Sequence, residues 1–560
     1  MLSQTYHRYI FFFGTALLLI GMPVSFFILS LAQIVLFINW LFEGNFRYKF
    51  NVIKTRKALL LIFSIYLVHV LGLFNTDNFF KTLFELRTLF IGSGIKEIIA
   101  NFKEVDLPEN FCWALHDLRI KLPLLILPLV YGTSEPFSKK EFKAVMQVFI
   151  ATVLANTFIT TFVLLGFSKN INPVDTRYAS LFISHIRFGL LVVLSVFSLV
   201  YLTYSNQFKL FKVEKIISSI LIIWFLCFLI LLKSFTGILI FLILFPVGSI
   251  WIAFYQKNRS LLKKVYITNI VFITVAMLFI FLSFLRYNHK ERINPEELKA
   301  RTANGRLYYH NTESDHYENG FLVWINICDE ELKNEWNQRS RFRFDSVDRK
   351  NQRVKITLIR YLTSRGYTKD SLGISKLDDK DIAMIENGYT NYLYRNKFAL
   401  YPKIYELFWQ IELYRKGANP GGHSLTQRIE FLKTGIHIIQ NNFWFGTGTG
   451  DVKEEYRLQY IKDDSKLNEK YRLRAHNQLF TFFLSFGPFG FLWISFALFY
   501  SPKLESKYSN FLFTIFFLIG ILSMLNEDTL ETHVGVSFFA FFYAFLLFSM
   551  PENDSNKHEA

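Results

Sequence analysis

The stretch HNQLFTFFLSFGPFGFLWISFALF, residues 476–499, decides the class of this protein. After its first residue, His476, it carries no ionisable side chain and is dominated by phenylalanine and leucine. About 20 apolar residues of helix are enough to cross the hydrocarbon core of a bilayer. The stretch therefore predicts a membrane-spanning helix with a histidine at its N-terminal end.

The rest of the chain repeats this pattern. Of the 560 residues, 52% are hydrophobic and 64 are phenylalanines, which is unusual for a soluble domain. We predict an all-α polytopic membrane protein with about 12 transmembrane helices. The expected spans are 8–21, 23–42, 57–74, 116–132, 142–166, 179–204, 214–232, 234–256, 264–287, 476–499, 508–525 and 531–549.

The net charge of +17 has two possible meanings, nucleic-acid binding or the holding of loops on the inner side of a membrane. The second is favoured, because the basic residues gather in the even-numbered connections between spans. They are Arg47, Lys49, Lys54, Arg56, Lys57, Lys139, Lys140, Lys143, Lys209, Lys212, Lys215, Lys257, Arg259, Lys263, Lys264, Lys503 and Lys507. The opposite turn NEDTLETH, residues 526–533, has acids and no lysine or arginine. This asymmetry predicts that both termini are cytoplasmic and that no nucleic acid is bound.

If the even-numbered connections are cytoplasmic, the odd-numbered ones lie on the outer side, and one of these is long and polar. We expect transmembrane helices 1–9 in residues 1–287, a large helical periplasmic loop in 288–475, and helices 10–12 with a short cytoplasmic tail in 476–560. The three cysteines, Cys112, Cys227 and Cys328, have no metal-ligand spacing. No cofactor and no metal site is expected.

Basic side chains mark the outer ends of several predicted spans. Arg119, Lys121, Arg187 and Lys233 occupy such positions, and Arg428 belongs to an amphipathic helix just outside the membrane. Charges near a bilayer are costly and usually face a cavity. Because an arginine fork matches two phosphate oxygens, these residues indicate a site for an anionic headgroup. For Lys121 and Lys233 the alternative is that the side chains extend to the interface without a ligand.

Two motifs carry a resemblance to a known family. Nine residues separate the pair His476-Asn477 from Gly487, the first residue of the corner Gly487-Pro-Phe-Gly490. This resembles the signature of the O-antigen ligase and polymerase family. Upstream, NNFWFGTGTGDV, residues 441–452, is similar to the glycine-rich segment of that family, and Arg428 occupies the place of its preceding arginine. The residues matching this segment are Gly446, Gly448, Gly450 and Asp451. The chain departs from the family pattern at Phe443, Leu432 and Phe235.

The resemblance implies both a fold and a reaction. Its members resemble GT-C-type, metal-independent glycosyltransferases of the bacterial inner membrane. They move a glycan from an undecaprenyl-diphosphate donor to an acceptor hydroxyl at the periplasmic face. For a ligase of lipopolysaccharide biosynthesis, the acceptor is a sugar of the lipid A core. His476 would then be the general base, and the basic residues would balance the charge of the leaving diphosphate.

Other functions remain open at this point. A polymerase of surface polysaccharide would use the same donor with another lipid-linked repeat as acceptor. A protein O-oligosaccharyltransferase would use a Ser or Thr hydroxyl. A non-enzymatic flippase of lipid-linked glycan is disfavoured, because the sequence shows no paired broken helices in two matching halves.

Overall fold

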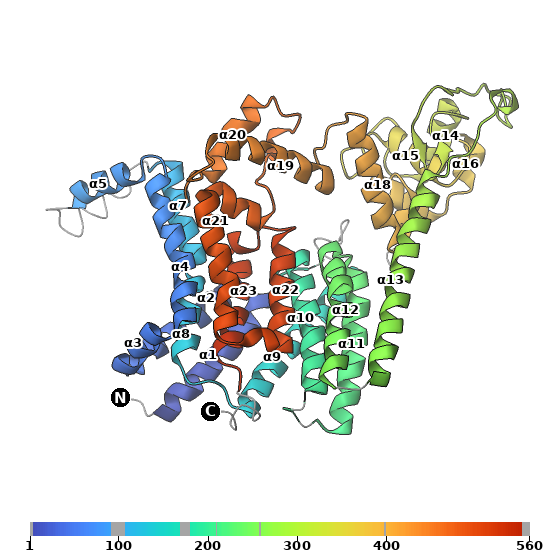
Figure 1. Cartoon of the computed structure of the whole chain (residues 1–560). Coiled ribbons are helices and arrows are strands. Elements are labelled where there is room, and N and C mark those ends of the chain that lie inside the picture. The colour runs from blue at the N-terminus through green and yellow to red at the C-terminus, as the bar shows by residue number, and fades with distance from the viewer. Residues whose placement is uncertain are drawn as a thin grey trace. The chain divides into compact units, whose positions relative to one another are not determined.

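The computed structural model describes residues 4–90, 107–167, 180–205, 207–208, 210–256, 259–396 and 399–551. Helices account for most of these residues (Figure 1). The named strands form a single two-stranded hairpin, β1 (Tyr317–Glu318) with β2 (Phe321–Leu322). The prediction of an all-α polytopic membrane protein is confirmed. Of the orientation lysines, Lys209 and Lys257 lie outside the described residues.

The chain forms two compact units. The first comprises Met1–Val265 and Ala418–Ala560, and the second comprises Tyr266–Gly417. These bounds differ from the predicted ones, since the expected loop 288–475 contributes its last part, from Ala418 on, to the first unit.

The first unit contains helices that overlap the predicted spans together with shorter helices that were not predicted as spans. They are α1 (Gln4–Val24), α2 (Phe26–Phe42), α3 (Phe46–Thr55), α4 (Lys57–Leu71), η1 (Gly72–Asn75), α5 (Phe79–Phe90), α7 (Glu109–Lys121), α8 (Pro123–Thr133), α9 (Lys139–Leu164), α10 (His185–Tyr204), α11 (Lys212–Leu232), α12 (Phe235–Tyr255), α19 (Ser424–Asn441), α20 (Val452–Lys462), η5 (Glu469–Tyr471), α21 (Gln478–Leu504), η6 (Lys507–Ser509), α22 (Phe511–Met524), η7 (Thr529–Glu531) and α23 (His533–Phe548).

Fewer helices than expected are long enough to span by themselves. Within the described residues, eight helices are long and apolar enough to cross a membrane, and the bent pair α2 and α3 is a possible ninth. The predicted span 116–132 divides into α7 and α8 at Leu122, directly before Pro123. A proline has no backbone N–H to continue the hydrogen-bond ladder of a preceding helix. The predicted spans 508–525 and 531–549 are the shorter apolar helices α22 and α23.

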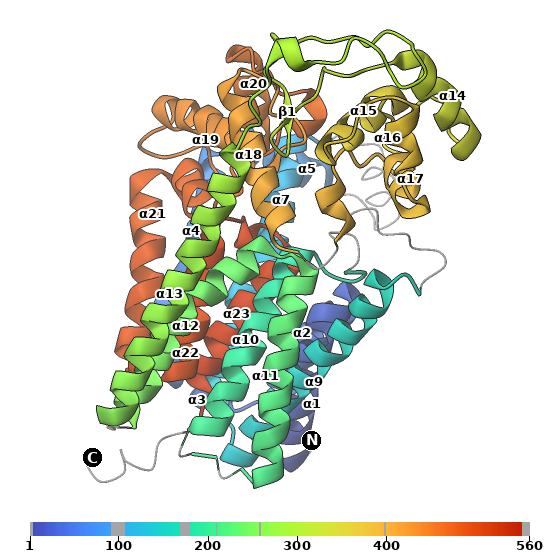
Figure 2. The same cartoon turned by 90° about the vertical axis from the view of Figure 1, so that its right-hand side faces the viewer.

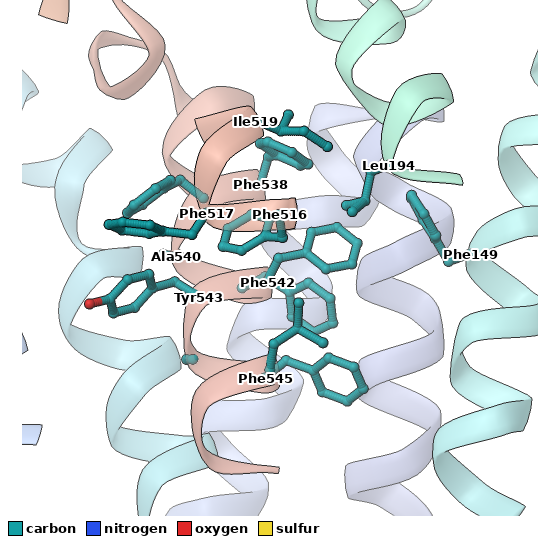
Figure 3. Close-up of a cluster of buried hydrophobic side chains, with 14 of the residues drawn as sticks. Phe149, Leu194, Phe516, Phe517, Ile519, Phe538, Ala540, Phe542, Tyr543 and Phe545 are labelled. Atoms are coloured by element: carbon teal, nitrogen blue, oxygen red, sulfur yellow. The ribbon is translucent and has the colours of Figure 1, made fainter. Parts of the chain in front are cut away.

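The core of the first unit surrounds these two short helices. Every residue of α23 from Val534 to Phe548 is buried. Figure 3 shows Phe516, Phe538 and Phe542 packed together, with Phe149 of α9 and Leu194 of α10 beside them. A helix that is apolar on all sides belongs in a protein core or in a membrane, and other helices enclose α23 on all sides. The turn between α22 and α23 is thereby fixed at one end of the helical core.

The second unit has its own core. It contains most of α13 (Arg259–Asn288), then η3 (Pro295–Glu297), β1, β2, α14 (Asp329–Arg339), α15 (Val354–Ser364), α16 (Ser371–Ser375), α17 (Asp379–Glu386), η4 (Tyr392–Arg395) and α18 (Tyr401–Arg415). Trp336, Leu358, Leu362 and Ile385 are fully buried at its centre. Helices α15, α16 and α17, which lie close together in Figure 2, supply many of the side chains of this core.

Candidate functional site

His476 lies in a strained loop directly before α21. Its backbone has a positive φ of 50°, a conformation that costs energy for a residue with a side chain. The next residue, Asn477, caps α21, since its Oδ1 accepts a hydrogen bond from the Phe480 N–H at 3.0 Å. The Asn477 amide also donates to the Leu525 carbonyl at 3.0 Å. The cap and this cross-link hold the histidine at the helix mouth, with 35% of its side chain exposed.

The histidine faces an acidic turn, residues 526–531, which joins α22 to α23. Nδ1 of His476 lies 3.7 Å from Oε2 of Glu527. Arg428 of α19 donates to Oε1 of the same carboxylate and to Oδ1 of Asn526, both at 2.5 Å. Burial alone would raise the pKa of Glu527, but His476 and the charges of Arg428 and Arg187 hold it below its usual range. Glu527 is thus ionised between a histidine and two arginines.

Arg187 approaches the same turn from the first helical turn of α10. Helices α10 and α12 are closely packed there, because a Cβ built on Gly237 would lie only 3.2 Å from the Cα of Gly189. Thr236, at the start of α12, accepts a hydrogen bond from the Asn526 amide at 2.7 Å. The guanidinium of Arg187 interacts electrostatically with Glu527 and Asp528. Among the described residues it makes no hydrogen bond or ion pair, so its donors remain available to a ligand.

A second group of charges is buried beside the acidic turn. Lys121 is 1% exposed and pairs with Asp117 and with Glu531, the latter at 3.1 Å. The other oxygen of Glu531 lies 3.1 Å from Arg474. Burial raises the pKa of Glu531, but Lys121 and Arg474 outweigh it and leave the pKa well below the usual range. We call Asp117, Lys121, Arg474 and Glu531 the buried charge cluster.

Asp528 is the third acid of the turn. It accepts a hydrogen bond from the Thr481 hydroxyl of α21 at 2.9 Å. Burial is the main influence on it and raises its pKa, despite the nearby charge of Arg474. The turn therefore contacts α21 through the neutral side chains of Thr481 and Gln478.

Two further predicted phosphate ligands, Arg119 and Lys233, belong to α7 and to the end of α11. Arg119 is exposed on α7, and its Nη2 lies 3.0 Å from Nδ1 of His116. Lys233 ends α11 with a positive φ of 52° and is half-buried. The structure thus brings His476, Arg187 and Arg428 to one turn and places Lys121 in the neighbouring buried charge cluster.

The glycine segment 446–450 packs against α21 and the end of α4. A Cβ on Gly446 would lie 2.3 Å from the Ser485 carbonyl carbon, and one on Gly448 would lie 2.8 Å from the Asn75 carbonyl. Backbone N–H groups of Thr447 and Gly448 donate to Leu484 and Ser485. These contacts leave no room for a side chain. Close packing alone therefore explains why glycine occupies these positions, and no ligand needs to be invoked.

The other motif residues complete this packing. Gly487 has a φ of 62° and kinks α21, and a Cβ there would lie 2.3 Å from the Trp444 carbonyl oxygen. A Cβ on Gly490 would meet Phe486, and one on Gly450 would meet the Asn110 carbonyl oxygen. Asp451 accepts a hydrogen bond from the Asp77 N–H at 2.7 Å, and burial raises its pKa. The motif thus joins distant segments and fixes the helix that begins beside His476.

Sequence reasoning missed the acids. It used the turn NEDTLETH only as a marker of orientation and did not consider Glu527, Asp528, Glu531 or Arg474 as site residues. The basic residues themselves could have indicated these acids. Four cations at one end of a membrane bundle require counter-charges nearby. That turn holds the acids expected on the same side.

Neither charge group forms a recognisable metal centre. Across the described ranges, no group of three or more His, Cys, Asp and Glu side chains could hold a metal ion. The arrangement offers instead an imidazole with one nitrogen toward a carboxylate, beside an arginine with available donors.

Comparison with known families identifies a family that part of the chain resembles. Residues 391–495 match the family model described as O-Antigen ligase, which confirms the predicted resemblance. The matched segment includes Arg428, the glycine segment, His476 and the Gly487–Gly490 corner. At a coarse level the match supports a membrane enzyme of the O-antigen ligase or polymerase type, which acts on a lipid-linked glycan and a glycan acceptor. No curated protein matches the chain.

Proposed function

We propose that this protein transfers a glycan from an undecaprenyl-diphosphate donor to a hydroxyl of the lipid A core, at the periplasmic face of the bacterial inner membrane. The observation that carries the proposal is the placement of His476 beside Glu527, with Arg428 and Arg187 at the same turn. The family match through 391–495 supports it, since both His476 and Arg428 lie in the matched segment.

In the proposed reaction His476 removes the acceptor proton. Its Nδ1 faces Glu527, which favours the tautomer with the proton on Nδ1 and leaves Nε2 to accept one. The acceptor oxygen forms a bond to the anomeric carbon of the donor while the bond from that carbon to the diphosphate oxygen breaks. The proton passes to Nε2, and the lipid diphosphate departs with the electron pair. Glu527 stabilises the imidazolium that results.

The arginines receive the diphosphate. Arg187 offers its donors directly, and Arg428 has five N–H groups of which two are used by Asn526 and Glu527. Preorganised donors aimed at developing negative charge are a large source of catalysis. The proposed reaction therefore uses no metal ion. Lys121 is already neutralised by two carboxylates and supports the site by holding Glu531. Arg119 and Lys233 are proposed to meet the glycan or the lipid phosphates farther from the reacting atoms.

Transfer can be measured directly. The purified chain in liposomes would receive undecaprenyl-diphosphate glycan and lipid A core, and the product would be followed on a gel. A glycan ladder on the core supports the proposal, whereas donor consumption without a core product contradicts it. In a deletion strain, loss of the whole ladder indicates a ligase, and a single repeat left on the core indicates a polymerase.

Orientation has its own test. Alkaline phosphatase and green fluorescent protein would be fused at residues 350 and 555. The proposed orientation predicts phosphatase activity at 350 and fluorescence at 555, because the basic connections hold the termini inside. The reverse pattern would place the proposed site in the cytoplasm.

A further inference from the structure

The second unit contains two adjoining cavities that the proposed chemistry does not use. Their volumes are about 690 Å³ and 370 Å³, and both are lined by Arg286, Tyr392 and Tyr401. Arg395 lines the larger cavity, whereas Arg365 and Tyr367 line the smaller. We call the joint cavity the arginine–tyrosine pocket.

One arginine of the pocket lacks a counter-charge. The guanidinium carbon of Arg286, near the end of α13, lies 4.4 Å from the centroid of the Tyr401 ring. In the part of the chain that the structure describes, Arg286 has no carboxylate partner. The other two have counter-charges, since Arg365 and Arg395 contact Asp381 at 2.7 Å and 2.9 Å and Arg395 also contacts Asp378 at 2.7 Å. The pocket is therefore attractive to an anion, and its stacked arginine is already oriented.

Aromatic faces form much of the remaining wall. Arg365 lies over the rings of Tyr367 and Tyr392, at 5.6 Å and 5.3 Å. A tyrosine presents a flat apolar face and a polar hydroxyl. A pyranose ring has the complementary form, with a face of C–H groups and hydroxyls around its edge.

The wall is also rigid. The Tyr392 N–H donates to the Ser364 hydroxyl at 2.9 Å, and the Asn319 amide donates to the Ser364 carbonyl at 2.9 Å. Asn391 caps the turn that carries Tyr392 through a hydrogen bond from the Leu393 N–H. A preformed pocket loses little conformational entropy when a ligand binds.

We propose that the arginine–tyrosine pocket binds an acidic sugar residue, one that carries a carboxylate or a phosphate. Arg286 contacts the acid group, and Tyr392 and Tyr401 pack against the sugar ring. That the sugar belongs to the transferred glycan or to its acceptor rests on the proposed function. The binding site itself does not, because every residue that forms it belongs to the second unit.

Binding would be measured by calorimetry on the full chain in nanodiscs of phosphatidylcholine, which present no anionic lipid. The probes are trigalacturonate, mannose 6-phosphate and the neutral sugar maltotriose. We expect saturable binding of at least one acidic probe and much weaker binding of maltotriose. Arg286→Gln should weaken acidic-probe binding about tenfold or more, as expected for a lost charged hydrogen bond. Tyr401→Leu should also weaken it.

Two controls make the result specific. Arg341 is exposed in the same unit and does not line the pocket, so Arg341→Gln should bind like the wild type. His476→Ala should also bind normally, which separates this proposal from the proposed function. The proposal is overturned if neither acidic probe binds, if maltotriose binds as tightly as both, or if Arg286→Gln binds like the wild type.

Discussion

Nδ1 of His476 lies 3.7 Å from Oε2 of Glu527, and Arg428 bonds the other oxygen of that carboxylate. Glu527 therefore links the proposed base to an arginine on another helix. A change in the charge of His476 therefore alters the electrostatic surroundings of Arg428. A change in the charge of Arg428 likewise alters those of His476.

The Glu527→Gln variant tests this link. The glutamine keeps the shape of the side chain and removes its charge, so the imidazolium formed during transfer loses its counter-charge. We therefore expect slower transfer. Initial rates of the purified variant and the wild type would be measured under the same conditions. Transfer at the wild-type rate would show that the Glu527 charge plays no part in the reaction.

The sequence was enough to predict the helical class, because spans of apolar residues have a length set by the bilayer. It also placed His476, Arg187 and Arg428 at one end of the bundle. It did not predict that α22 and α23 are short, since it did not identify Asn510 and Thr532 as the residues whose side chains cap their N-termini. Nor did it pair Glu527 with His476, since that contact joins residues far apart in the chain.

Arg187 and Arg428 are predicted to differ in their effects. Arg187→Lys keeps the charge and loses the two-pronged geometry, so we expect weaker donor binding. Each charged hydrogen bond lost corresponds to about 1.5–3 kcal/mol. Arg428→Lys should lower turnover more than donor affinity, because Arg428 also positions Glu527. Donor affinity and turnover would be measured separately.

Arg457 provides the matched control for these variants. It is exposed on α20 and paired with Glu454 of the same helix. Arg457→Lys should leave both quantities unchanged. Normal affinity and normal turnover in both Arg187→Lys and Arg428→Lys would remove the arginines from the proposed site.

The buried charge cluster predicts a pH-dependent stability. Glu531→Gln removes the carboxylate that Lys121 and Arg474 share, although Lys121 keeps Asp117, and this loss should cost about 1–3 kcal/mol at neutral pH. Because the folded pKa of Glu531 is lowered, its contribution is present above the ordinary range of a carboxyl and is lost as the pH falls through the folded pKa. The difference between variant and wild type should therefore shrink on acidification.

Thermal unfolding in detergent at several pH values would measure this difference. Glu469→Gln, at an exposed site, is the control and should unfold like the wild type. A Glu531→Gln variant as stable as the wild type at neutral pH would show that the cluster does not brace the fold.

Independence from metal ions is a fourth prediction. The proposed charge balance comes from arginines, so transfer in EDTA with metal-stripped components should proceed at the normal rate. Activity that disappears in EDTA and returns with magnesium or manganese would contradict the mechanism, because a cation would then supply the charge assigned to Arg187.

The last prediction concerns His476. If it is the base, His476→Ala should fold and insert normally, because the side chain is partly exposed and lies at a helix mouth. Donor binding should persist, since it depends on the arginines. Transfer should fall by about 10²–10⁴, which is typical of a lost general base. The wild-type rate should rise with pH as the imidazole loses its proton, and this rise should be absent in the variant. His476→Gln distinguishes a base from a positioning group, because glutamine can donate and accept hydrogen bonds but cannot take the proton. Near-normal transfer by His476→Gln, at matched expression, would show that His476 only orients the helix mouth.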